Sequence, residues 1–145
     1  MAKEAPVRTE RPLPGVTPLN EPFWQAAHEH RFMLFRCKRC GAWYWPPAFC
    51  RNHDNEPFMG NLEWQQASGR GRVFTFDVIR RQMHPLFPVP YVYGLIELEE
   101  GPLYGSNVIG CDPDEVYVGM PVEVVFEDIS DEYSLPKFRP MKSQQ

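Results

Sequence analysis

The chain has 145 residues, 43% hydrophobic and 23% charged, so we expect one ordinary domain or a small domain with a minor module, and not a disordered chain. Its sixteen prolines, ten glycines and twenty aromatic residues favour a β-rich fold with frequent turns over a helical bundle. The net charge of −4 argues against a general nucleic-acid binder, because affinity for nucleic acid comes largely from cations that neutralise phosphates.

The charge is unevenly distributed. Residues 1–61 carry eight Lys/Arg and six Asp/Glu, whereas residues 62–145 carry seven and thirteen, so the second half is the less suited to phosphate. No apolar run approaches the roughly 20 residues that span a bilayer, and the N-terminal residues lack the apolar stretch of a secretory signal. We therefore expect a soluble, cytoplasmic protein without a membrane partner, in which clustered cysteines are more often metal ligands than disulfides.

The first elements in chain order are an arm and a helix. Residues 1–19 are rich in proline and predict an extended arm, which is either a disordered tail or a segment that wraps a partner. Asn20 can cap a short helix with Pro22 in its first turn. The spacing then places four residues on one helix face: Phe23, Ala26, Ala27 and His30.

Residues 31–37 predict a strand that leads into a metal module. Cys37-x2-Cys40, nine residues and then Cys50-x2-His53 form two knuckles, and such two-residue gaps let two side chains converge on one Zn²⁺. Asp54 and Cys111 are alternatives to His53 as the fourth ligand. A complete ligand set without a glutamate at a general-base spacing favours structural zinc over catalytic zinc, and over redox chemistry by Cys37 and Cys40.

The residues after 61 predict mainly strands. Phe74, Phe76 and Val78 alternate with Thr75 and Asp77, which indicates a strand with one buried face. Residues 82–90 contain three prolines and predict a loop, whereas residues 100–102 predict a hairpin turn. A strand at 121–129 and a final edge strand at 135–141 complete five or six strands, a number typical of an OB-type Greek-key barrel.

Several stretches together resemble the DUF35 family, whose members join a rubredoxin-like zinc ribbon to an OB fold. They are "PFWQAAHEHRFMLFRCKRCG" (22–41), "VGMPVEVVFED" (118–128) and "PKFRP" (136–140). The resemblance covers roughly residues 20–141, and His53 stands where the family has its usual fourth cysteine. We therefore expect a mainly β fold with an arm (1–19), a helix plus zinc ribbon (20–61), an OB fold (62–141) and a tail (142–145).

The resemblance implies a small, non-catalytic subunit that binds a thiolase-superfamily enzyme, or sometimes a hydratase, acting on acyl-CoA. Such a subunit orders its partner and helps to line the coenzyme A or acyl-CoA channel, in an expected heterotetramer with two copies of each chain. An aromatic β-oxoacyl-CoA thiolase of toluene degradation is the case that the resemblance suggests. The partner's reaction class (thiolase, aldolase or hydratase) is left open.

Candidate contacts with coenzyme A, acyl-CoA or the partner lie in the proline loop and the ribbon. Arg80 and Arg81 could pair with phosphates, and aromatic residues could meet an acyl group or the partner. The candidates are Arg80, Arg81, His84, Phe87, Tyr91, Trp43 and Trp45. The alternative for each is a solvated or packing residue, and Cys111 is interpreted as an inert buried thiol and not as a nucleophile.

Two other functions are compatible with these residues. The Trp43–Trp45 run could stack the bases of single-stranded nucleic acid, since zinc ribbons and OB folds both serve that use, but the acidic second half disfavours it. A free-standing acyl-CoA-binding protein is the other alternative.

Overall fold

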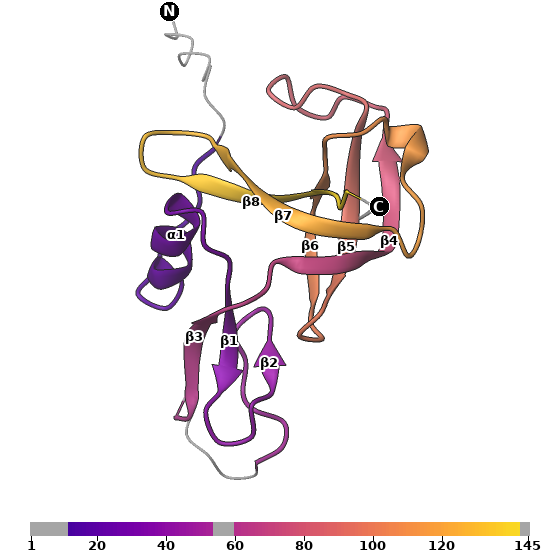
Figure 1. Ribbon diagram of the computed structural model, residues 1–145. Coiled ribbons are helices and arrows are strands. Elements are labelled where there is room, and N and C mark those ends of the chain that lie inside the picture. The colour runs from indigo at the N-terminus through magenta and orange to yellow at the C-terminus, as the bar shows by residue number, and fades with distance from the viewer. Residues whose placement is uncertain (1–11, 54–59, 143–145) are drawn as a thin grey trace, which may run out of the picture.

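The computed structural model describes residues 12–53 and 60–142, and these residues form a mainly β protein (Figure 1). A helix and a three-stranded sheet make up one part, and a closed barrel makes up the other. Among the described residues, no helix combines the length and the apolar character needed to cross a bilayer. The elements in chain order are α1 (Glu21–His28), β1 (Met33–Cys37), β2 (Trp43–Tyr44), β3 (Leu62–Gln66), β4 (Arg70–Ile79), β5 (Tyr91–Leu98), β6 (Leu103–Val108), the 3₁₀ turn η1 (Pro113–Glu115), β7 (Pro121–Asp128) and β8 (Ser134–Pro140).

Helix α1 buries the face that the spacing predicts, with Phe23, Ala26 and Ala27 all at most 2% exposed. The prediction was wrong for His30, because the helix ends at His28 and His30 lies beyond it in a left-handed conformation (φ 60°). His30 instead stacks on Phe126 of β7 at a ring-centroid distance of 5.2 Å. The side chain of Asn20 also makes no cap hydrogen bond to the helix; its Oδ1 accepts from the Thr17 N–H at 2.7 Å.

The three-stranded sheet has the order β2-β1-β3, and β1 and β3 are paired over five residues each. Residues 62–66 therefore complete the ribbon sheet, one strand beyond the division expected after residue 61. The reason is that Leu62 finds a buried place beside Phe35 and Cys37, a contact between residues distant in sequence. The third strand of the ribbon sheet is thus β3, which the sequence pattern assigned to the barrel.

The barrel is closed in the order β4-β5-β6-β8-β7, which gives the five strands expected of an OB-type fold. The predicted edge position of the last strand was wrong, since β8 pairs with β7 along seven residues and meets β6 at one parallel bridge, Val108 with Phe138. Pro136 is tolerated because its carbonyl faces β6 and accepts from the Ser106 hydroxyl at 2.7 Å. Its missing N–H thus falls on the side where few ladder bonds form.

A bulge in β4 changes which aromatic side chains enter the barrel. The register with β5 shifts between Val73 and Thr75, so Val73 is buried while Phe74 is 51% exposed. Phe76 and Val78 return to the inner face and pack against the core. The expected alternation therefore held for Phe76 and Val78 and failed for Phe74, because one extra residue inverts the side-chain direction.

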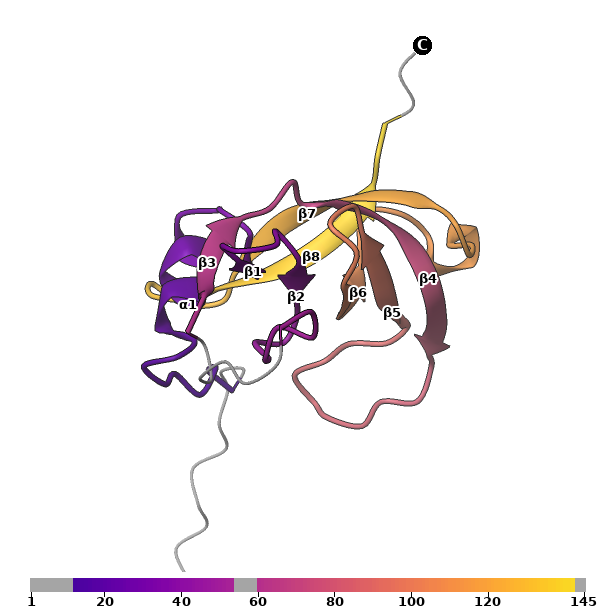
Figure 2. The same cartoon turned by 90° about the horizontal axis from the view of Figure 1, so that it is seen from below.

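An aromatic cluster joins the two parts of the molecule. Figure 2 shows α1 and β3 on one side and β4, β5 and β6 on the other, with β7 and β8 running between the two sides. Between them, Phe32 from the segment before β1 meets Phe138 of β8 and Tyr104 of β6 edge-to-face, at centroid distances of 6.0 and 5.2 Å. The ribbon and the barrel therefore share one hydrophobic core.

We expect Phe138→Ala to lower the free energy of unfolding by about 3–5 kcal/mol, because it leaves a cavity where a fully buried ring touches both parts. Phe74→Ala is the matched control and should change stability by about 0.5 kcal/mol or less, since Phe74 is half exposed. Urea unfolding of both variants measures the difference. Equal destabilisation by the two substitutions would contradict the described core.

Candidate functional site

Four side chains with metal-binding atoms converge at the tip of the ribbon: Cys37, Cys40, Cys50 and His53. Their ligand atoms all lie within 4.8 Å of one another, and the Sγ atoms of Cys40 and Cys50 are 3.5 Å apart. In a tetrahedral zinc site with Zn–S bonds of about 2.3 Å, ligand atoms are separated by about 3.5–3.8 Å. The four residues proposed from sequence therefore have a spacing that fits one zinc ion.

His53 carries an independent sign of a metal. Its Nε2 is buried and, within the described part of the chain, has no hydrogen-bond partner. A buried polar atom without a partner is unusual, and a bound ion would satisfy it. Of the two alternative ligands, Asp54 lies outside the described residues, and Cys111 follows β6 in the barrel and is not part of the cluster.

The first knuckle is held by backbone hydrogen bonds. Cys37 ends β1, its N–H donates to the Ala42 carbonyl, and its own carbonyl accepts from the Gly41 N–H, each at 2.8 Å. Gly41 has φ 77°, a conformation that glycine adopts without steric cost. The chain thereby reverses directly after Cys40.

Two neighbours that sequence reasoning missed donate to the sulfur atoms. Asn52 Nδ2 lies 3.4 Å from Cys40 Sγ, and this hydrogen bond is the main cause that lowers the pKa of Cys40 to about 6. The Tyr44 hydroxyl donates to Cys50 Sγ at 3.4 Å and accepts from the Arg51 N–H at 2.9 Å. Donors of this kind orient metal ligands and stabilise thiolates. Asn52 lies between Cys50 and His53 in the sequence, and this position could have indicated that its side chain contacts the metal ligands.

The arrangement is suited to holding structure. Three thiols and one imidazole fill the four positions of a tetrahedral ion and leave none for water or substrate. Burial raises the pKa of Cys37, which lies in the small core with Phe35 and Leu62. A bound zinc would tie the end of β1, the turn at Cys40 and the segment 50–53 together. These four residues support a structural zinc site.

The other predicted contact residues fall into two groups. Those of the 80–90 loop lie on the barrel. Arg80 forms an exposed ion pair with Asp114 at 3.1 Å, and Arg81 is exposed. His84 accepts from the Leu86 N–H through Nδ1 at 3.1 Å, and its ring lies 5.2 Å from that of Phe87. Phe87 and Tyr91 line a groove of about 320 Å³ on the barrel surface.

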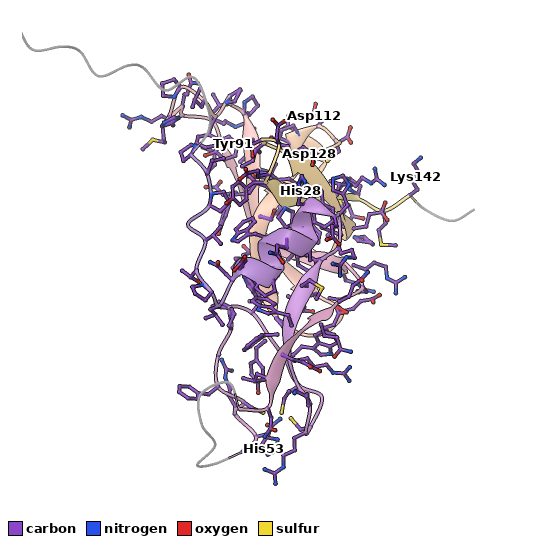
Figure 3. The ribbon with its side chains drawn as sticks, turned by 90° about the vertical axis from the view of Figure 1, so that its left-hand side faces the viewer. His28, His53, Tyr91, Asp112, Asp128 and Lys142 are labelled. Atoms are coloured by element: carbon purple, nitrogen blue, oxygen red, sulfur yellow. The ribbon has the colours of Figure 1, made fainter. Side chains whose placement is uncertain are left out.

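The tryptophans lie elsewhere. Trp43 is half-buried beneath the Arg36 guanidinium, 4.8 Å from its ring centroid. Trp45 packs between Phe23 and Tyr104, so it faces the junction of ribbon and barrel. Figure 3 shows His53 at one end of the molecule and Tyr91 toward the other. Neither tryptophan is among the residues that line the groove with Phe87 and Tyr91.

Cys111 is half-buried at the end of the β6 segment and packs against the main core. Burial raises the pKa of its thiol, with the carboxylates of Glu115 and Asp112 adding to the effect. A raised pKa keeps the thiol protonated and weakly nucleophilic. The environment thus agrees with the interpretation of Cys111 as an inert residue.

Comparison with known proteins matches both parts of the chain. Residues 24–52 match the model of the ChsH2 rubredoxin-like zinc ribbon domain, and residues 64–127 match the model of the ChsH2 C-terminal OB-fold domain. A solved chain from the structure titled "Ltp2-ChsH2(DUF35) aldolase" is 33% identical with a TM-score of 0.78, covering 88% of this chain and 98% of that one.

Two curated relatives are similar over most of this chain. A DUF35 domain-containing scaffold protein of Methanocaldococcus jannaschii is 35% identical, over 75% of this chain and 77% of the relative. A probable enoyl-CoA hydratase alpha subunit of Thermomonospora curvata is 34% identical over 93% of this chain. This chain spans only 41% of the length of that hydratase subunit.

We expect the purified chain to carry one zinc ion and Cys40→Ser to lose it, because three ligands hold zinc much less tightly than four. Cys111→Ser, a thiol outside the cluster, should keep the full zinc content. Elemental analysis of both variants tests this expectation. Zinc-free wild-type protein, or equal zinc loss in the two variants, would contradict the assignment.

His53→Ala should weaken zinc binding by at least about 100-fold, more than the loss of an outer-shell hydrogen bond causes. The matched control is His84→Ala, since His84 lies in the barrel loop and outside the cluster. Competition with a chromogenic chelator measures the affinity of each variant. Unchanged affinity in His53→Ala would leave the fourth ligand to another residue.

Proposed function

This chain belongs to the DUF35 family, and on that premise we propose that it is a zinc-containing accessory subunit of an enzyme that acts on acyl-CoA. The observation that carries the proposal is the likeness to the solved ChsH2(DUF35) chain, which extends over 98% of that chain at 33% identity. The name of that structure includes an aldolase, and the relative from Thermomonospora curvata is named as a probable enoyl-CoA hydratase alpha subunit. A shared accessory role is the simplest property that these names have in common.

In this proposal the chain supplies structure and surface, and a partner subunit supplies the reacting groups. The zinc ribbon packs against the barrel through Trp45, which contacts Tyr104 of β6. The barrel loop 80–90 carries Arg80 and Arg81, two exposed cations that could pair with phosphates of coenzyme A. Phe87, Tyr91 and His84 of the same region would meet the acyl group or the partner surface.

The finer proposal concerns the partner. We place the chain beside a thiolase-superfamily subunit, in a cytoplasmic heterotetramer with two copies of each chain, and an aromatic β-oxoacyl-CoA is the substrate we favour. The basis is the resemblance of the sequence to accessory subunits of such enzymes. If the partner is a hydratase or an aldolase, this chain keeps its accessory role and the complex catalyses a different reaction.

The test is co-expression of this chain with the thiolase-like protein encoded nearest to it. We expect the two proteins to co-purify as a complex of defined mass, and thiolysis of an aromatic β-oxoacyl-CoA to require both. Activity should fall by at least about tenfold when either chain is omitted, because an incompletely formed substrate site loses orientation. Mass photometry and a thioester assay give the two readouts.

Three outcomes distinguish the accessory role, the thiolase assignment and the alternative function from one another. Full activity of the partner alone would remove the accessory role. A stable complex with hydratase or aldolase activity would keep that role and overturn the thiolase assignment. Salt-sensitive binding of single-stranded nucleic acid, without a protein complex, would favour the alternative function.

A further inference from the structure

The groove on the barrel lies between the 80–90 loop and the outer faces of β5, β6, β7 and β8. Its volume of about 320 Å³ is near the lower end of the range for small-molecule sites, about 300–1,000 Å³. It occupies the face of the second and third barrel strands, beside the first loop of the barrel, which OB folds use for ligands. Its lining residues are Phe87, Pro88, Tyr91, Tyr93, Asn107, Ile109, Glu127 and Lys137.

Tyr93 lies across the sheet within this groove. It is on β5 opposite Asn107, yet its hydroxyl reaches diagonally to Gly105 of β6, where a Cβ atom would lie only 2.5 Å from the hydroxyl oxygen. Because Gly105 has no side chain, the tyrosine ring can occupy the space above it. Tyr93 remains 49% exposed, so the ring is held by the sheet and still open to solvent. This geometry is that of a stacking platform.

Apolar side chains stand around the platform. Tyr91 lies on the same outer face of β5, two residues before Tyr93. Phe87 is 37% exposed and is braced by the ring of His84 at 5.2 Å, while Ile109 is also 37% exposed. Aromatic walls with exposed faces favour a flat ring over a branched or saturated group, because flat rings stack with little lost contact.

The polar groups of the groove are pre-positioned. Lys137 Nζ donates to Asn107 Oδ1, and Asn107 Nδ2 donates to the Val92 carbonyl at 2.9 Å. The amide is thereby fixed, and the ammonium group is placed at the edge of the apolar lining. A few fixed polar groups in an aromatic groove orient a ligand through its hydrogen-bond acceptors.

We propose that this groove binds a planar aromatic ring of a CoA thioester, stacked on Tyr93 with an acceptor atom toward Lys137. The ring is either the adenine of the CoA moiety or an aromatic acyl group, and the same chemistry recognises both. The assignment of CoA thioesters as the ligand class rests on the proposed function. The proposal names Tyr93 and Gly105 as determinants of binding, two residues that were not predicted from the sequence.

The experiment titrates the full, zinc-loaded chain with benzoyl-CoA, cyclohexanecarbonyl-CoA and acetyl-CoA by isothermal calorimetry. Tighter binding of benzoyl-CoA than of the other two thioesters identifies the acyl ring as the ligand. Equal binding of all three, with competition by adenosine 3′,5′-bisphosphate, identifies adenine. No saturable binding overturns the proposal, as does equal preference for the benzoyl and cyclohexanecarbonyl thioesters over acetyl-CoA.

Variants assign the binding to the platform. Tyr93→Ala should weaken binding by at least about tenfold, whereas Tyr93→Phe keeps the ring and most of the affinity. Gly105→Ala should also weaken binding, since the new Cβ displaces the flexible end of Tyr93 and leaves the backbone in place. Tyr117→Ala, at an exposed tyrosine outside the groove, is the matched control and should bind as the wild type does.

Equal effects of Tyr93→Ala and Tyr117→Ala would overturn the proposal, as would an unchanged affinity in Tyr93→Ala. Zinc content and circular dichroism of each variant confirm folding. Co-purification with the partner is measured in parallel. If the complex forms while Tyr93→Ala and the wild type bind every thioester alike, the proposed binding of an aromatic ring in the groove is wrong. The proposed accessory role is then unaffected.

Discussion

Trp45 packs between Phe23 and Tyr104 at ring-centroid distances of 4.8 and 4.9 Å. This contact joins the metal module to the barrel, and the rest of the structure depends on it. Trp45 lies in the chain between Cys40 and Cys50, so an ion that holds the two knuckles also holds the tryptophan in place. Tyr104 is only 7% exposed in this junction, and its burial raises the pKa of its hydroxyl group. A structural metal would therefore stabilise the barrel contact at a distance from its ligands.

A second link joins the segment after α1 to the barrel. His30 Nε2 lies 3.1 Å from Asp128 Oδ1, and the buried hydroxyl of Ser134 donates to that same carboxylate oxygen. The Ser134 hydrogen bond is the main cause that lowers the pKa of Asp128. The segment after α1 is thus attached to the β7–β8 hairpin by both a ring stack and a polar contact. Since the ribbon and the barrel are held at two places, the metal centre and the barrel groove keep a defined separation.

Local patterns in the sequence were sufficient for much of the fold and for the ligands. Cysteine and histidine spacing needs no tertiary information, because two residues between ligands already direct both toward one ion. The buried face of α1, the loop at 82–90 and the hairpin turn at 100–102 follow in the same way from periodicity and proline or glycine content. The failures were at Phe74, His30 and the last strand, where a bulge, an early helix end and barrel closure are decided by packing partners far away in sequence. The hydrogen bonds of Asn52 and Tyr44 to the cysteine sulfur atoms could not be predicted for the same reason, since they depend on the directions of the side chains.

The sequence by itself determined the candidate zinc ligands and a β-rich chain, because these follow from spacing and composition over short stretches. The family, with its ribbon before a barrel, came from the resemblance of longer stretches to DUF35 proteins. Only the tertiary structure decided which surfaces exist. It turned Trp45 inward to the junction, separated it from Phe87 and Tyr91, and laid Tyr93 over Gly105. The physical reason is that a groove is formed by side chains from several strands and a loop, and the registers of those strands are set by closing the barrel, a condition that no local segment contains.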